Sequence, residues 1–390
     1  MNVHAYVNIH NTVNIDELRG AGLELALESQ LKNILSDISW LPSWEVKRPS
    51  SARDRGFDFE AVLAIPKGNT HLLVECKQDL RPSQFGALRQ QREPAFGHTY
   101  QTIPVLAMPI VSSRVAELCE VNDWSWFDLA GNCHIEVPGA LYLDRRGNEP
   151  VHRPPRPQAN LSTPAAGRVV RALLAPENAG VRWTQRSMEN HFGNLVPSLS
   201  GPSLGLINKV VRYLRDQAWI EVSTDGGFRL RDPMSLLLAW RDAYRFDRHQ
   251  RMAYFTLLQG KSLLHALYLL DLEAGGFAAY AAFAAAENQA PHVRQPKSWL
   301  YVDRAYVETF EKLTKAKLVD SGENLILLMP EDPGVFYMAE GGQVGHGRMA
   351  STNPVQTYVD LLHAGGRGEE AAEALLDQRL KPVWARDKLV

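Results

Sequence analysis

The sequence predicts a multidomain α+β protein, and three observations support this prediction. Residues 20–137 alternate between amphipathic helical segments and short strand-like segments, which is typical of an α/β domain. Residues 145–166 are rich in proline and arginine and lack apolar periodicity, as expected of an extended linker. After the linker, helices and strands mix again. We therefore expect an N-terminal domain over residues 1–144, a second domain over 167–232 and a C-terminal α+β domain over 233–390.

The first predicted element is a helix over residues 22–38, whose apolar residues recur at helical spacing. The residues on this face are Leu27, Leu31, Ile34, Leu35 and Ile38. Three strands, a helix, a strand, a smaller helix and two strands follow in that order. Their predicted ranges are 43–48, 57–65, 71–77, 81–95, 102–110, 113–121, 124–129 and 133–139.

After the linker, residues 168–175, 184–192 and 202–217 each predict a short helix. Thr184 is a plausible N-cap, and Pro202 lies near the first turn of the third helix. Strands over 219–223 and 228–232 are joined by Thr-Asp-Gly-Gly, a strong hairpin signal. Three helices followed by a hairpin are the pattern of a winged helix-turn-helix.

The C-terminal region is predicted to mix helices and strands, with no internal repeat. We expect an amphipathic helix over 236–246, alanine-rich helices over 275–288, strands over 298–303 and 324–330, and helices over 353–380.

The composition excludes several classes of protein. The 390 residues are 45% hydrophobic and 22% charged, which suits a soluble globular protein of two or three domains. The formal net charge is −2, so any surface that binds a polyanion must be local. Three widely spaced cysteines predict neither a disulfide framework nor a zinc site.

Two further observations concern location. The first 20 residues lack a basic segment followed by an apolar one, so no secretion signal is predicted. The apolar run over 262–286 is broken by His265, Asp271 and Glu273, which argues against a membrane span. We expect a cytoplasmic protein without a membrane partner.

The strand over 71–77 ends in Glu75-Cys76-Lys77. Alternate residues of a strand share a face, so Glu75 and Lys77 point the same way. Folding the hairpin about Gly68 and Asn69 brings Asp58 beside them. Two carboxylates and a lysine suit Mg²⁺-assisted phosphodiester hydrolysis, in which the metal polarises the phosphate and lowers the pKa of the attacking water. Charged ends of an ordinary strand are the alternative.

With the helix that bears Glu24 and Glu28, this arrangement resembles the PD-(D/E)xK restriction-endonuclease-like fold over about residues 20–137. The resemblance implies Asp58, Glu75, Lys77 and Glu28 as catalytic candidates, with Asp58 and Glu75 as Mg²⁺ ligands if the nuclease is active. Phe57 stands where the family usually has proline. We therefore expect an accessory DNA or dimer contact.

The third helix of the second domain predicts a DNA-binding face. Leu204, Ile207, Val211 and Leu214 would face the core. The residues predicted to point outward are Ser203, Gly205, Asn208, Lys209, Arg212 and Arg215. This polar and positive face suits a recognition helix on duplex DNA. Supporting cations are predicted at Arg182, Arg186 and Arg229, and in the linker at Arg153 and Arg156. A winged helix that binds protein is the alternative.

Two segments resemble known bacterial families. Asp128-Leu129-Ala130-Gly131-Asn132 resembles a stretch in bacterial proteins that join a nuclease-like domain to a winged helix; physically it is also an ordinary turn between strands. Residues 353–376 resemble the ending of the AbiE-type antitoxins, transcriptional regulators of type IV toxin–antitoxin systems. The residues that match are Gln356, Asp360, Leu361, Gly366, Arg367, Glu370 and Ala371. A Gly-Gly break between packed helices is the alternative.

The antitoxin resemblance covers roughly residues 160–385. It implies a bacterial DNA-binding regulator that represses its own promoter and opposes a nucleotidyltransferase-like toxin. The expected partners are double-stranded DNA, this toxin and a second copy in a homodimer. DNA binding would need no cofactor, and Mg²⁺ would be needed only by an active nuclease. The alternatives are a Mg²⁺-dependent DNA endonuclease targeted by the winged helix, and a plasmid or mobile-element DNA-binding protein without a toxin.

Overall fold

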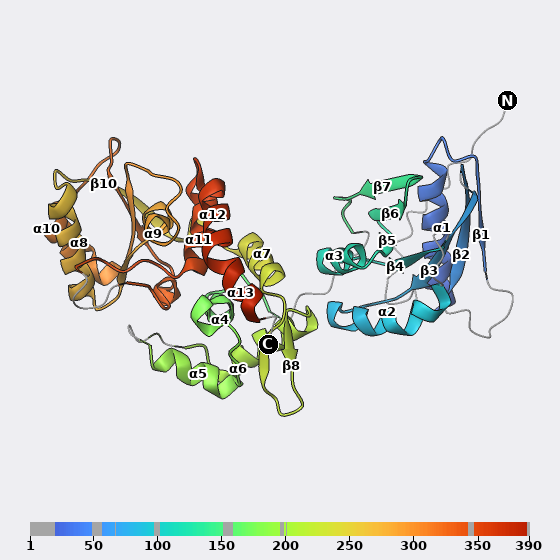
Figure 1. Cartoon of the computed structure of the whole chain (residues 1–390), viewed down its shortest axis with the longest axis horizontal. Helices are drawn as coiled ribbons and strands as arrows, with labels where there is room; N and C mark the ends of the chain where they lie inside the picture. Colours follow the sequence, from blue (N-terminus) through green and yellow to red (C-terminus); the bar gives the residue numbers. More distant parts are fainter. Residues whose placement is uncertain are drawn as a thin grey trace. The chain divides into compact units, whose positions relative to one another are not determined.

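The chain forms two compact units, residues 1–156 and 157–390, in a computed structural model (Figure 1). The structure describes residues 20–48, 57–66, 68–96, 102–150, 159–195, 199, 201–341 and 347–387. The linker arginines Arg153 and Arg156 lie outside the described residues.

The N-terminal unit contains one seven-stranded sheet, in which the strands lie side by side in chain order. The strands are β1 (Ser43–Lys47), β2 (Phe59–Ile65), β3 (Gly68–Cys76), β4 (Thr102–Met108), β5 (Ser125–Asp128), β6 (Cys133–Val137) and β7 (Leu141–Arg145). The pairs β3–β4 and β4–β5 are parallel, and the other neighbouring pairs are antiparallel.

Helices cover both faces of this sheet. Helix α1 (Ala21–Ser36) packs its buried leucines against one face, which includes Phe59, Leu72 and Val74. Helices α2 (Pro82–Phe96) and α3 (Ser113–Val121) cover the opposite face, which includes Leu73 and Leu106. The alternation along β3 therefore sends Leu72 and Val74 to α1 and Leu73 to α2, as the period of a strand requires.

The predicted order of elements in this unit is confirmed, with one addition. Strand β7 extends the sheet by pairing with β6, from Cys133 opposite Arg145 to Val137 opposite Leu141. This strand was not predicted, because its five residues are a short alternation that is stabilised by pairing with β6. The hairpin turn also differs: Ile65 pairs with Gly68, so Gly68 begins β3.

The C-terminal unit begins with three helices and a hairpin at the predicted places. They are α4 (Pro164–Leu174), the 3-10 turn η2 (Pro176–Asn178), α5 (Gln185–Gly193), α6 (Leu204–Asp216), β8 (Ile220–Val222) and β9 (Phe228–Leu230). Thr163 caps α4 and Pro164 occupies its first turn, so the helix begins inside the predicted linker. Thr184 and Ser187 cap α5 reciprocally.

A five-stranded sheet follows, in the order β11-β12-β14-β10-β13. Its strands are β10 (Gln250–Phe255), β11 (Ala278–Tyr280), β12 (Ser298–Val302), β13 (Lys317–Leu318) and β14 (Leu325–Met329). Helices α8 (Gly260–Ala274) and α10 (Val307–Thr314) pack on one face, which includes Tyr254. Helices α9 (Ala282–Gln289), α11 (Pro354–Ala364) and α12 (Gly368–Leu375) pack on the other.

The remaining elements are α7 (Pro233–Ala243), the 3-10 turns η3 (Phe246–Arg248), η4 (Arg304–Tyr306) and η5 (Pro333–Phe336), the π-helical η6 (Leu376–Leu380) and α13 (Lys381–Asp387). One expectation was wrong here: residues 278–280, expected in a helix, form β11. Pairing with β12 overrides alanine's helix propensity, and the left-handed Gly275 ends α8 before the strand.

The second and third predicted domains share one hydrophobic core. Val169, Leu173 and Leu214 belong to the same buried cluster as Tyr301, Val355 and Leu375. Residues on both sides of the predicted boundary at 232/233 thus stabilise each other. Among the helices that the structure describes, none has both the length and the apolar character needed to span a membrane.

Candidate functional site

The strand pair β2–β3 brings three of the four predicted catalytic residues together. Phe59 lies opposite Val74, which places Asp58 beside Glu75. The Asp58 amide donates to the Val74 carbonyl oxygen at 2.9 Å, and its Oδ2 accepts from the Cys76 amide at 2.6 Å. The Asp58 carboxylate thus closes the end of the strand ladder.

Glu75 is the most deeply buried of these residues, with 1% of its surface exposed. Its Oε1 accepts hydrogen bonds from Lys77 Nζ and, at 2.9 Å, from Arg92 Nη2 of helix α2. Its Oε2 has no hydrogen-bond partner among the described residues. A buried carboxylate needs charge compensation, and here two cations of the chain supply it.

Arg92 was not among the predicted site residues, although its spacing offers a signal. Phe85 and Leu88 of α2 are buried against the sheet, and Arg92 follows Leu88 by four residues on the same helical face. A cation on the buried face of a helix indicates a buried anion opposite it.

Glu28 lies apart from this group, on α1 at the opposite face of the sheet. It accepts from Lys32 Nζ at 2.7 Å and from Arg48 Nε at 2.8 Å. Burial acts to raise the pKa of Glu28, but the hydrogen bonds from Lys32 and Arg48 outweigh it, so that the pKa is lowered. Across the described part of the chain, no three His, Cys, Asp or Glu side chains are arranged to hold a metal ion.

The segment Asp128–Asn132 is a tight turn between β5 and β6. Asp128 accepts from the Asn132 amide and from Asn132 Nδ2, both at 3.0 Å. Gly131 has φ +84°, and a β-carbon there would lie 3.0 Å from Gln30 Nε2. Burial raises the pKa of Asp128, against the hydrogen bonds from Asn132. These contacts define a structural role for the turn.

Helix α6 has the amphipathic face that its sequence predicts. Ile207, Val211 and Leu214 are buried, whereas Leu204 is partly exposed. The predicted outward residues are all exposed: Ser203, Gly205, Asn208, Lys209, Arg212 and Arg215. Asn208 Oδ1 accepts from Gln185 Nε2 of α5 at 3.3 Å, which ties the two helices together. A cationic surface therefore lies along one side of α6.

The predicted cations divide into paired and unpaired side chains. Arg182 pairs with Asp225, Arg229 pairs with Glu221, and Arg215 pairs with Asp216 at 2.9 Å. Among the described residues, Lys209, Arg212 and Arg186 have no ionic partner.

A buried polar network joins α4 to α11. Arg171 of α4 donates from Nε to Gln356 Oε1 at 2.7 Å and stacks over Trp240, 5.0 Å from the ring centre. Gln356 Nε2 donates to Asp360 Oδ1 at 2.7 Å, as does the Tyr301 hydroxyl at 2.9 Å. Two residues of the antitoxin-like motif, Gln356 and Asp360, are thus part of the core.

The electrostatics of Asp360 differ from those of an ordinary aspartate. The residue is fully buried, and its Oδ2 has no hydrogen-bond partner within the described structure. Burial raises the pKa of Asp360 to about 7, and the hydrogen bonds from Tyr301 and Gln356 offset only part of this effect.

The Gly-Gly break of the same motif is a close approach between α11 and α12. Gly365 and Gly366 have positive φ angles of 76° and 59°. A β-carbon at Gly368 would overlap the carbonyl oxygen of Leu361. The exposed Arg367 pairs with Glu370 on the surface. Glycine here is required by backbone geometry.

Residues 229–381 match the family model described as "Transcriptional regulator, AbiEi antitoxin, Type IV TA system". The match runs from β9 to the first residue of α13 and so does not include α4, α5 or α6. No curated protein and no solved structure matches the chain. The C-terminal region is therefore similar to the AbiEi antitoxins.

Proposed function

We propose that the protein is a bacterial, cytoplasmic DNA-binding transcriptional regulator that acts as the antitoxin of a type IV toxin–antitoxin system and represses its own promoter. The observation that carries this proposal is the family match over residues 229–381. The matched region shares its hydrophobic core with α4 and α6. We therefore include these two helices in the proposed regulator.

The cationic face of α6 supports DNA binding. We interpret α4, α5, α6 and the β8–β9 hairpin as a winged helix-turn-helix, with α6 as the recognition helix on duplex DNA. Lys209 and Arg212 are exposed and unpaired within the described structure, so they can neutralise phosphates without first breaking an ion pair. Ser203 and Asn208 are exposed near the start of the helix, and we propose that they face base edges.

DNA binding is tested with the full-length protein and a duplex of its own promoter. In Lys209→Ala/Arg212→Ala, we expect weaker binding and a shallower dependence of log affinity on log salt, by about one unit for each phosphate that is no longer neutralised. Arg304→Ala is the matched control, because this exposed arginine of η4 lies on another part of the unit. Unchanged binding by the double variant would exclude α6 as the recognition helix.

The antitoxin role is tested by co-expression with the product of the adjacent gene, which we propose to be a nucleotidyltransferase-like toxin. Removing residues 233–390 would expose the core that they share with α4 and α6. The test therefore uses the full-length chain rather than a truncated one. We expect growth to be restored by the wild type. A toxin that arrests growth equally with and without the full-length protein would contradict the antitoxin role.

For the N-terminal unit we propose an accessory DNA or dimer contact on a PD-(D/E)xK-like fold. The neutralisation of Glu75 by Lys77 and Arg92, and the separation of Glu28 from Glu75, support this proposal. The alternatives, a Mg²⁺-dependent endonuclease and a mobile-element DNA-binding protein without a toxin, gain no specific support from the described residues.

A further inference from the structure

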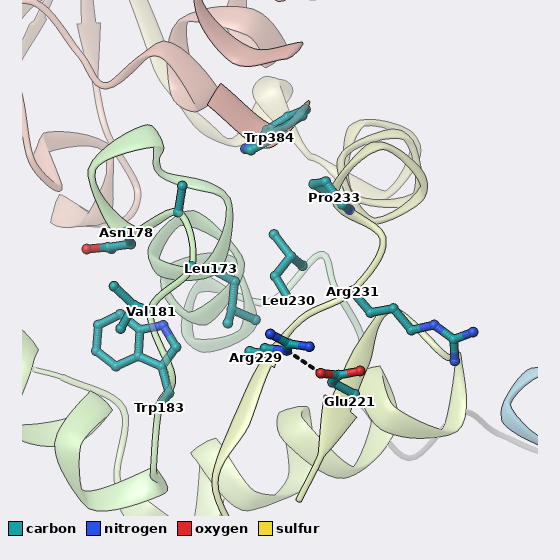
Figure 2. A pocket seen from close by; sticks show the side chains of 12 residues that line it. Leu173, Asn178, Val181, Trp183, Glu221, Arg229, Leu230, Arg231, Pro233 and Trp384 are labelled. Carbon is teal, nitrogen blue, oxygen red and sulfur yellow. Dashed lines mark hydrogen bonds and ion pairs between the residues drawn. The ribbon is translucent and has the colours of Figure 1, made fainter. Parts of the chain in front are cut away.

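The C-terminal unit contains a cavity of about 390 Å³ beside the β8–β9 hairpin (Figure 2). Its walls come from the end of α4, the segment after η2, strand β9 and helix α13, so residues far apart in the chain meet there. This volume lies within the range of about 300–1,000 Å³ that is typical of small-molecule sites.

Most of the wall is apolar. Figure 2 shows Trp384 of α13 above Leu173 and Leu230, with Trp183 and Val181 on the other side. Two of these residues are held firmly: Trp384 Nε1 donates to the Leu174 carbonyl oxygen at 3.2 Å, and the Trp183 amide donates to the Phe228 carbonyl oxygen at 2.7 Å. Trp384 and Trp183 are only 6% and 5% exposed, so their edges contribute to the apolar wall together with the partly exposed Val181 and Leu230.

The polar part of the wall is cationic. Arg229 and Arg231 line it together with Glu221, and Glu221 pairs with Arg229. Arg231 is exposed and has no ionic partner in the described structure. Asn178 also lines the cavity, but its amide already donates to the Ala172 carbonyl oxygen and to the Tyr337 hydroxyl. The guanidinium group of Arg231, and that of Arg229 once a ligand displaces Glu221, can therefore donate hydrogen bonds to a ligand.

We propose that this cavity binds a small aromatic anion, with the ring against the apolar part of the wall and a carboxylate or sulfonate on Arg231 and Arg229. A planar guanidinium suits an oxyanion, because it donates two parallel hydrogen bonds. Arg229 and Glu221 are both largely exposed, so the ligand can replace Glu221 as the partner of Arg229 at little cost. This inference does not depend on DNA binding.

The test uses the full-length protein and 8-anilinonaphthalene-1-sulfonate as the probe. We expect saturable binding of one probe per chain by calorimetry, with quenching of tryptophan emission by energy transfer from Trp183 and Trp384. The neutral N-phenyl-1-naphthylamine has the same rings without the sulfonate, and we expect it to bind roughly tenfold more weakly.

Variants locate the site. Arg231→Ala is expected to weaken sulfonate binding by roughly tenfold and to leave the neutral probe unaffected, whereas the matched Arg304→Ala changes neither. Ala179→Phe fills the cavity and should abolish binding of both probes, while Ala179→Ser should preserve it. If Ala179→Phe fails to fold, sulfonate binding by Arg231→Ala still tests the proposal. Equal binding by the wild type and Arg231→Ala, or several equivalent probes per chain, would overturn the proposal.

Discussion

Glu75 in the N-terminal unit and Asp360 in the C-terminal unit are both buried carboxylates, but the side chains that donate hydrogen bonds to them differ in charge. Glu75 is compensated by Lys77 and Arg92, which are both cations. Asp360 accepts instead from the neutral Tyr301 and Gln356, and its pKa rises to about 7. Each keeps one oxygen without a partner among the described residues. The raised pKa of Asp360 therefore comes from burial, which the hydrogen bonds from neutral donors offset only in part.

The largest expected effect concerns Asp360. The folded protein has a raised pKa of about 7, against 3.8 for an ordinary aspartate. The stability contributed by the protonated form is therefore complete below about pH 4 and is lost as the pH rises to about 7. The loss is on the order of 4 kcal/mol, at 1.36 kcal/mol for each pKa unit.

Asp360→Asn removes this titration. Unfolding in urea between pH 5 and 8 is expected to show the variant gaining stability relative to the wild type as the pH rises. Asp247→Asn is the control, because its hydrogen bond from Arg245 lowers the pKa of Asp247 to about 2, so that it stays ionised throughout this range. A difference between Asp360→Asn and the wild type that stays constant with pH would refute the assignment.

Removing the cation beside Glu75 is expected to have the next largest effect. Arg92→Ala leaves a buried carboxylate with Lys77 alone, and we expect it to lower the free energy of unfolding by about 3 kcal/mol. Arg89→Ala, on the exposed side of the same helix, should cost less than about 1 kcal/mol. Urea unfolding of both variants measures the difference. Similar costs for the two would mean that the Arg92–Glu75 bond contributes little.

Two cations of the proposed DNA surface differ in the same respect. Arg212 is unpaired in the described structure, whereas Arg182 must leave Asp225 before it meets a phosphate. We expect Arg212→Ala to weaken DNA affinity by about tenfold at low salt and Arg182→Ala by less. Equilibrium binding at two salt concentrations separates them. A larger loss for Arg182→Ala would place the wing, rather than α6, at the centre of the interface.

The smallest expected effect is on DNA cleavage. With Glu75 held by two cations, we expect the wild type to leave supercoiled and linear DNA intact in Mg²⁺ or Mn²⁺, and Glu75→Ala to behave in the same way. Gel analysis after prolonged incubation is the measurement. Cleavage by the wild type that disappears in both Glu75→Ala and Lys77→Ala would establish the endonuclease instead.

Much of the fold could be predicted because the spacing of apolar residues along the chain indicates helices and strands. Leu27, Leu31 and Ile34 recur at helical intervals and are buried in α1, and the outward face of α6 followed from the same rule. Strand β11 could not be predicted, since its three residues are mostly alanine and only pairing with β12 makes them extended. Strand β7 was hidden for a similar reason, its short alternation being stabilised by β6.

The candidate sites divide in the same way. The register of β2 and β3 follows from their alternation, so the proximity of Asp58 to Glu75 was predictable. The pairing of Glu28 with Arg48 was not, because Arg48 lies 20 residues further along the chain. The predicted role of Glu28 therefore depended on a tertiary contact that no local pattern contains.

By itself, the sequence determined the order of most helices and strands before residue 233, the basic face of α6 and the hydrophobic faces of the N-terminal sheet, because these depend on periods of two and 3.6 residues. Only the tertiary structure decided which charges are compensated and where a cavity forms. Arg171 and Gln356 are separated by 185 positions, and Trp384 reaches the Leu174 carbonyl oxygen across 210. Such contacts arise when distant segments pack into one core, and packing selects partners by shape and charge rather than by spacing along the chain.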